Sequence, residues 1–80
     1  MQLEKQLIAL IARTFAVDAA ILHSESGQED LKAWDSLGHL RLIMQVEAEF
    51  GVAFSIDEIP TLTSISKIAT SIRAKQIGKE

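Results

Sequence analysis

Residues 35–50, DSLGHLRLIMQVEAEF, decide the fold because they carry the clearest helical pattern in the chain. Apolar residues recur there at gaps of three or four, which is the spacing of an amphipathic helix. Asp35 or Ser36 can cap its first turn, since either side chain accepts a hydrogen bond from a backbone N–H, and Gly51 can end it. The side chains that we expect on one shared face are Leu37, Leu40, Ile43, Met44 and Glu47, with Leu42, Val46 and Phe50 widening the apolar arc.

The same spacing predicts a helix on each side of this one. The first covers residues 3–15, which no glycine or proline interrupts. The last begins after Thr63 or Ser64, because either hydroxyl can cap it. Its predicted core face is Ile65, Ile68, Ala69 and Ile72.

The connections between these helices are predicted to be loops with short turns. Asp18 can cap a turn that ends at Ile21, and residues 23–28 have strong loop character. Residues 56–59 form at most one helical turn, which Pro60 stops. The side chains expected to hold the long connection of residues 16–34 against the core are Val17, Ile21, Leu22 and Leu31.

Together these elements predict an all-α bundle of three main helices plus one short helix, with a long loop between the first two helices. Residues 1–80 are expected to form a single domain, with residues 1–2 and 77–80 frayed. The composition agrees, because 48% apolar and 24% charged residues suit a globular chain. A chain this short has little room for a deep active site, which favours a carrier or binding module over an enzyme.

Composition and charge exclude several further classes. There is no cysteine for a disulfide framework, and His23 and His39 are too few and too isolated to form a metal site. A net charge of −3 argues against nucleic-acid binding, which needs cations to neutralise phosphates. No apolar run approaches the roughly 18 residues of a membrane span, and no signal peptide is seen. The expected location is the cytoplasm.

Ser36 is the residue whose position suggests chemistry. A serine at the start of a helix lies where backbone N–H groups and the positive end of the helix dipole meet, which favours a phosphate. The alternative is that Ser36 is an ordinary helix cap. A third reading pairs Ser36 with His39 as nucleophile and base, but the chain has no Gly-x-Ser-x-Gly motif and no evident partner to orient the histidine.

The surrounding pattern resembles the acyl carrier and peptidyl carrier protein family over residues 3–72. The segments that carry the resemblance follow one another in order and spacing: EDL at 29–31, DSL at 35–37, EAEFG at 47–51, IDEI at 56–59 and TSI at 63–65. The resemblance implies a carrier domain and not an enzyme. It implies that a phosphopantetheinyl transferase moves 4'-phosphopantetheine from coenzyme A to Ser36, and that the thiol of this arm holds acyl or aminoacyl groups.

The resemblance also implies roles for the neighbours of Ser36. Asp35 helps to present Ser36 to the transferase, and Leu37 helps the transferase and other partners to grip the start of the helix. The other partners implied are enzymes that load and transfer acyl groups to a monomeric carrier. If Ser36 is only a cap, the chain is instead a degenerate carrier that binds partners non-covalently.

Three residues depart from the strongly acidic second helix of many fatty-acid carriers. Arg41 places a cation where such carriers often have a carboxylate, and Trp34 stands where small residues are common. His39 is expected to be a surface residue near the arm. We therefore expect a specialised acyl carrier whose partners contact Trp34, Leu37, His39 and Arg41.

Two residues also have a purely structural interpretation. Trp34 is expected to cover the core, as large aromatic residues usually do, and Met44 is expected to fill it.

Overall fold

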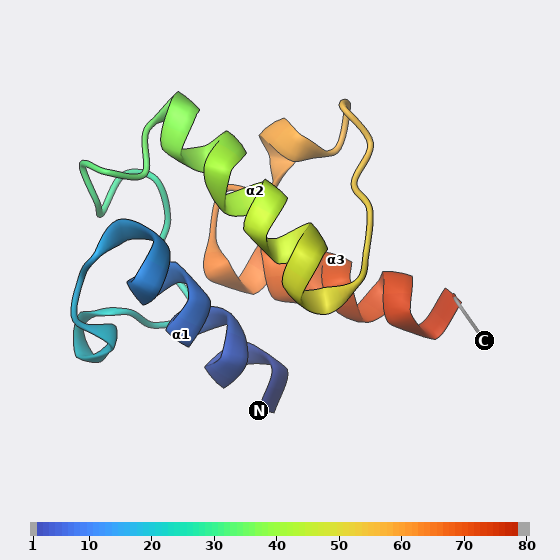
Figure 1. The fold of residues 1–80 in the computed structure, drawn as a ribbon, viewed down its shortest axis with the longest axis horizontal. Helices are drawn as coiled ribbons and strands as arrows, with labels where there is room; N and C mark the ends of the chain where they lie inside the picture. The colour runs from blue at the N-terminus through green and yellow to red at the C-terminus, as the bar shows by residue number, and fades with distance from the viewer. Residues whose placement is uncertain (1, 79–80) are drawn as a thin grey trace.

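The computed structural model describes residues 2–78 and confirms the predicted all-α fold. Three α-helices are joined by a long loop and a shorter one, each of which contains a single 3-10 turn (Figure 1). In chain order the elements are α1 (Gln2–Phe15), η1 (Ala19–Ile21), α2 (Ser36–Phe50), η2 (Ile59–Thr61) and α3 (Ile65–Gly78). Helix α1 packs against both α2 and α3.

The ends of the helices largely follow the predicted capping residues. Asp35, rather than Ser36, caps α2, because its carboxylate accepts a 2.8 Å hydrogen bond from the N–H of Gly38. Gly51 ends α2 in the left-handed conformation, with φ 64°. Ser64 caps α3 by accepting from the N–H of Lys67 at 3.2 Å. Asp18 caps η1 as predicted.

Helix α1 ends on a residue that is poorly suited to its conformation. Ala16 has φ 56°, in the left-handed region that glycine adopts at lower cost. The N–H of Val17 then donates to the carbonyl oxygen of Ala12 at 3.0 Å, which closes the helix end. Phe15, one residue earlier, is buried in the core.

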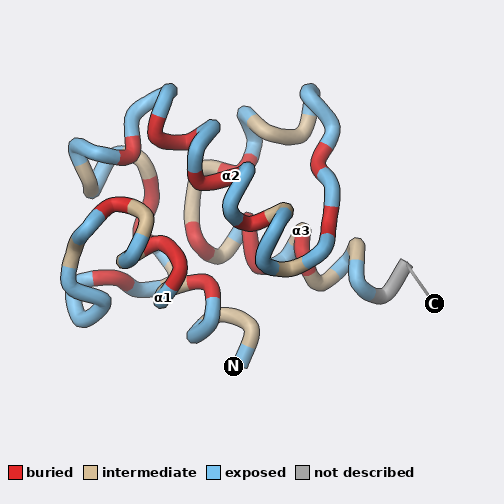
Figure 2. The backbone as a smooth tube through the Cα atoms, viewed as in Figure 1, coloured by how far each residue is buried: buried red, intermediate tan, exposed pale blue. Residues whose placement is uncertain are grey.

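The core is made by the inner faces of the three helices and by side chains from both loops (Figure 2). On α3 the predicted face is confirmed, since Ile65, Ile68, Ala69 and Ile72 are all buried. The remaining buried apolar residues are Leu7, Leu10, Ile11, Phe15, Leu22, Trp34, Leu42, Ile43, Val46, Val52, Phe54 and Leu62.

Three of the residues that the spacing predicts on one shared face of α2 lie on its outer side. Leu37, Leu40 and Met44 are 71%, 50% and 67% exposed, so Met44 is not a core residue. The face that packs inward is instead that of Leu42, Ile43 and Val46, with Gly38 and His39 one turn earlier. Residues 37–46 are apolar on nearly every side of the helix, so three–four spacing fits more than one face.

Two smaller expectations also need correction. Ile21 is 56% exposed and does not hold the long loop to the core, whereas Leu22 is buried and does. Pro60 lies inside η2 rather than stopping a turn before it, because the first turn of a helix does not need the N–H that proline lacks. Gln2 and residues 77–78 belong to α1 and α3, and residues 1 and 79–80 lie outside the described range, so the expected fraying of both ends stays a prediction.

The long loop is anchored on the start of α3. The N–H groups of Ile65 and Ser66 donate to the carbonyl oxygens of Ser26 and Ser24 at 2.9 and 2.8 Å. The loop thereby satisfies donors that the first turn of a helix leaves without intrahelical partners. Gly27 is required at this contact, because a Cβ there would overlap the carbonyl oxygen of Thr63. None of the helices within residues 2–78 has the length and apolar character needed to cross a bilayer.

Candidate functional site

Ser36 is the first residue of α2 and is exposed to solvent. Asp35 performs the capping, so the Ser36 hydroxyl is not used for it, and within residues 2–78 this hydroxyl makes no hydrogen bond. The reading of Ser36 as only a helix cap is therefore wrong. The N–H groups of Ser36 and Leu37 belong to the first turn, where helix geometry provides no acceptor. The site thus offers an unengaged hydroxyl beside two outward N–H groups.

The approach to Ser36 depends on a close contact at Gly38. A Cβ on Gly38 would overlap the carbonyl oxygen of Ala33 and would lie 3.1 Å from a ring carbon of Phe15. The absence of a side chain lets the loop that precedes Ser36 turn tightly over the first turn of α2. The glycine is therefore part of how the serine is presented.

A buried hydrogen-bonded pair lies beneath the site. The indole N–H of Trp34 donates to Nδ1 of His39 at 2.8 Å, and Nε2 of His39 lies 2.9 Å from the carbonyl oxygen of Ile59. An indole N–H can only donate, so Nδ1 carries no proton, and the neutral ring donates from Nε2 to the Ile59 carbonyl. The Phe15 ring stacks on Trp34 with centroids 5.7 Å apart. One histidine therefore joins the long loop, α2 and η2.

This pair corrects two of the predicted partner contacts. His39 is 5% exposed and Trp34 is fully buried, so the expectation of a surface histidine is wrong and neither side chain offers a surface to a partner. The expectation that Trp34 covers the core is confirmed. Both ring nitrogens of His39 are engaged away from Ser36, so the nucleophile–base pair is not formed. A lone histidine in an apolar helix five residues after a tryptophan was the signal for this pair.

Two different flanks of α2 border the exposed stripe of Leu37, Leu40 and Met44. On the flank toward η2, a shallow depression of about 340 Å³ adjoins the serine and is lined by Gln28, Ser36, His39, Leu40, Ile59 and Pro60. On the flank toward α1 stands Arg41, which is exposed as expected. Of the four predicted partner contacts, Leu37 and Arg41 are therefore accessible. Leu37 lies on the exposed stripe, and Arg41, one turn later, lies beside it on the flank toward α1.

The acidic residues of the long loop do not form a metal site. Asp30 accepts a 2.8 Å hydrogen bond from the N–H of Gly27, which orders the loop. Across the described part of the chain, no three His, Cys, Asp or Glu side chains are grouped so as to hold a metal ion.

Comparison with known proteins identifies the family to which the chain belongs. A family model described as "Phosphopantetheine attachment site" matches residues 5–72. The acyl carrier proteins of Rickettsia typhi and Rickettsia prowazekii are each 33% identical to the chain over 76 residues, covering 94% of this chain and 87% of each relative. The chain therefore belongs to the phosphopantetheine-attachment family of carrier proteins.

The fold comparison points to the same kind of carrier. A solution NMR structure of a holo acyl carrier protein from Geobacter metallireducens matches with a TM-score of 0.86 at 28% identity, covering 99% of this chain and 91% of that one. The predicted function of an acyl carrier protein, which is a carrier and not an enzyme, is confirmed, and so is 4'-phosphopantetheine as its cofactor.

Proposed function

We propose that Ser36 is the residue to which 4'-phosphopantetheine is attached. The strongest support comes from the start of α2. Asp35 caps the helix, and the Ser36 hydroxyl is exposed and makes no hydrogen bond with the described residues. Ser36 is also the serine of the DSL segment, residues 35–37, that resembles the family. When bound, the arm supplies a terminal thiol that holds an acyl or aminoacyl group as a thioester, a group that a cysteine-free chain lacks.

The residues around Ser36 fit a phosphate ester. The positive end of the α2 dipole and the outward N–H groups of Ser36 and Leu37 favour negative charge at this point. Asp35 fixes the first turn through Gly38 and so holds the hydroxyl in one place for a transferase. Leu37, 71% exposed beside the serine, gives that enzyme an apolar contact.

The partners that we propose are a phosphopantetheinyl transferase and the enzymes that load and remove acyl groups. Their contact surface is the exposed face of α2, with Leu37, Leu40, Met44 and Arg41. We further propose that residues 1–80 act as one monomeric carrier domain in the cytoplasm. Arg41 supports a specialised acyl carrier, because a cation there disfavours enzymes with a basic docking patch.

The attachment site can be tested by intact mass. The purified chain is incubated with coenzyme A and a promiscuous phosphopantetheinyl transferase, and the expected result is a gain of one phosphopantetheine. Ser36→Ala abolishes the gain. Ser55→Ala is the control and leaves the gain unchanged, because Ser55 is likewise an exposed serine, although its hydroxyl, unlike that of Ser36, accepts a hydrogen bond from the N–H of Glu58.

Two results would overturn the assignment. One is an unmodified wild-type chain when a known carrier is modified in the same tube. The other is a Ser36→Ala variant that still gains the full mass. A partner complex that forms equally well with Ser36→Ala and with the loaded chain would instead support the non-covalent module.

A further inference from the structure

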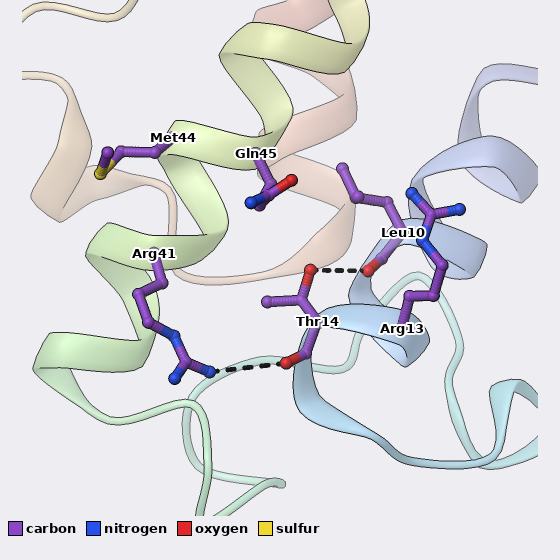
Figure 3. Close-up of a pocket in the computed structure, with 6 residues that line it drawn as sticks. All are labelled: Leu10, Arg13, Thr14, Arg41, Met44 and Gln45. Atoms are coloured by element: carbon purple, nitrogen blue, oxygen red, sulfur yellow. Dashed lines mark hydrogen bonds between the residues drawn. The ribbon is translucent and has the colours of Figure 1, made fainter.

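A hollow between α1 and α2 is bordered by two arginines and by no acidic residue. It holds about 450 Å³ and is lined by Leu10, Arg13, Thr14, Arg41, Met44 and Gln45 (Figure 3). The chain as a whole has a net charge of −3. The lining of the hollow therefore carries positive charge on a molecule whose net charge is negative.

The charge of Arg41 is not compensated by any carboxylate of the described residues. Its guanidinium reaches across from α2 to the carbonyl oxygen of Thr14, at 3.4 Å, in the last turn of α1 (Figure 3). The negative end of the α1 dipole lies there and holds the side chain at the rim of the hollow without cancelling its full charge. Arg13 pairs with Glu49 at 3.4 Å, but the two side chains are 65% and 45% exposed, so this pair is weak.

Neither acidic residue of α2 pairs with Arg41. Residues 36–45 contain no Asp or Glu. Glu47 accepts a hydrogen bond from the N–H of Phe54 at 2.9 Å, which directs its carboxylate to the following loop. Glu49 is the partner of Arg13. The half of α2 that begins at Ser36 therefore presents one cation, Arg41, beside exposed apolar side chains.

We propose that this hollow is the docking site for a partner protein that brings an Asp or Glu side chain next to an apolar one. The inference rests on the proposed carrier function, since the partner is an enzyme that acts on the group carried at Ser36. Its carboxylate pairs with the Arg41 guanidinium, for which a two-point hydrogen bond is the favoured geometry. Its apolar neighbour covers Met44 and Leu37, which flank Arg41 on the outer face of α2. The charge of the hollow selects against partners whose docking patch is basic.

The proposal can be tested with two synthetic helical peptides as probes. Both present leucines at positions i and i+4, and they differ only in carrying glutamates or glutamines between them. The chain, labelled with ¹⁵N and either unloaded or loaded, is titrated with each peptide. We expect the glutamate peptide to bind more tightly, to weaken as salt is added, and to shift the amide signals of Arg13, Arg41 and Gln45.

Charge reversal sharpens the test. Arg41→Glu is expected to weaken binding of the glutamate peptide about tenfold, which corresponds to about 1.4 kcal/mol. Lys67→Glu is the matched control, because it makes the same change at an exposed lysine of α3 beside a different hollow, and it is expected to have little effect. Circular dichroism of both variants checks that each remains folded.

The docking proposal is overturned by any of four results. These are equal affinity for the two peptides, no binding of either, shifts confined to another face, or an Arg41→Glu variant that binds as well as Lys67→Glu. Loading of Ser36 is measured by mass on the same wild-type sample. If the chain is loaded at Ser36 but does not bind the glutamate peptide, only the docking proposal is overturned. If the chain is not loaded, the proposed attachment at Ser36 is overturned.

Discussion

The indole N–H of Trp34 and Nδ1 of His39 share a 2.8 Å hydrogen bond inside the core. His39 passes the connection on to the Ile59 carbonyl, so three segments far apart in the sequence meet at one imidazole. Each buried polar group in this chain of contacts has its partner, which is the condition under which such groups do not destabilise a small core. Ser36 lies between Trp34 and His39 in the sequence, so this pair supports the turn that carries it.

Replacing His39 by Leu is expected to destabilise the chain by about 2–4 kcal/mol, because it leaves the Trp34 N–H and the Ile59 carbonyl without partners. Unfolding in urea, followed by tryptophan fluorescence, measures this loss. His23→Leu is the control, since His23 is exposed and its side chain accepts a hydrogen bond only from the N–H of Glu25, and its cost should stay below about 0.5 kcal/mol. Equal stability of the two variants would show that the buried pair contributes nothing.

Gly38→Ala is expected to destabilise the chain by about 1–3 kcal/mol and to slow loading of Ser36. In an ordinary helix this change stabilises by about 1 kcal/mol, so the sign of the effect reports the contact with Ala33. Ala48→Gly in the exposed part of the same helix provides the reference for propensity alone. A more stable Gly38→Ala variant would mean that the loop moves aside without cost.

Ala16→Gly is expected to stabilise the chain by about 0.5–1 kcal/mol, because Ala16 has φ 56° and glycine adopts this conformation without strain. For a domain of this size the melting temperature should rise by about 2–8 °C. Ala53 is also exposed but does not have a positive φ, so Ala53→Gly should lower the melting temperature instead. The same direction of change in both variants would rule out relief of strain at Ala16.

Asp35→Ala is expected to cost about 0.5–2 kcal/mol through loss of the cap, whereas Ser36→Ala should change stability by less than about 0.5 kcal/mol. The comparison is made by urea unfolding of both unloaded variants. It separates the two residues by role, since only Asp35 bonds to the first turn. A larger cost for Ser36→Ala would return the capping role to the serine.

The Glu58 carboxylate should make stability depend on pH in acid. Lys75 Nζ lies 2.8 Å from Oε1, and the Ser71 hydroxyl donates to Oε2 at 2.5 Å. The hydrogen bond from Lys75, followed by that from Ser71, lowers the pKa of Glu58 below its ordinary value of 4.5. Because the pKa is lower in the folded state, the stabilisation is fully present above the ordinary pKa of 4.5. It is lost as the pH falls through the folded-state pKa.

The measurement compares urea unfolding of wild type and Glu58→Gln from neutral pH to about pH 3. The wild type should be the more stable chain at neutral pH, and the difference should shrink in acid. Asp57→Asn is the control, because Asp57 is exposed next to Glu58 and makes no hydrogen bond or ion pair with other described residues. A constant difference for Glu58→Gln across this range would contradict the linkage.

The sequence was enough to predict the helices and the exposed position of Ser36 at the start of α2, but not the face of α2 that packs inward. Helix α3 has one narrow apolar stripe, so spacing alone identified Ile65, Ile68, Ala69 and Ile72 as buried. In α2 the apolar residues surround the helix, and the inward face is selected by contacts with α1 and with Trp34, which no local pattern contains. Spacing alone therefore placed Met44 in the core, although it is 67% exposed.

His39 was misplaced for a related reason. Its burial depends on two partners, the Trp34 indole and the Ile59 carbonyl, of which the second lies 20 residues away. The tryptophan five residues earlier was a local signal for the first partner, but no local spacing points to the Ile59 carbonyl, and His39 was predicted as a surface residue. The position of Ser36 was predictable because it depends only on the capping pattern of its own first turn.

The anchoring of the long loop sets a limit on how carried groups can travel. Two sets of contacts hold the loop before Ser36. Ser24 and Ser26 accept hydrogen bonds from the start of α3, and Trp34 donates to His39 inside the core. Because these contacts hold the backbone before Ser36 in place, bending of the loop does not carry Ser36 from one enzyme to the next. The distance over which a carried group can be moved is then set by the length of the phosphopantetheine arm and by rotation of the whole domain.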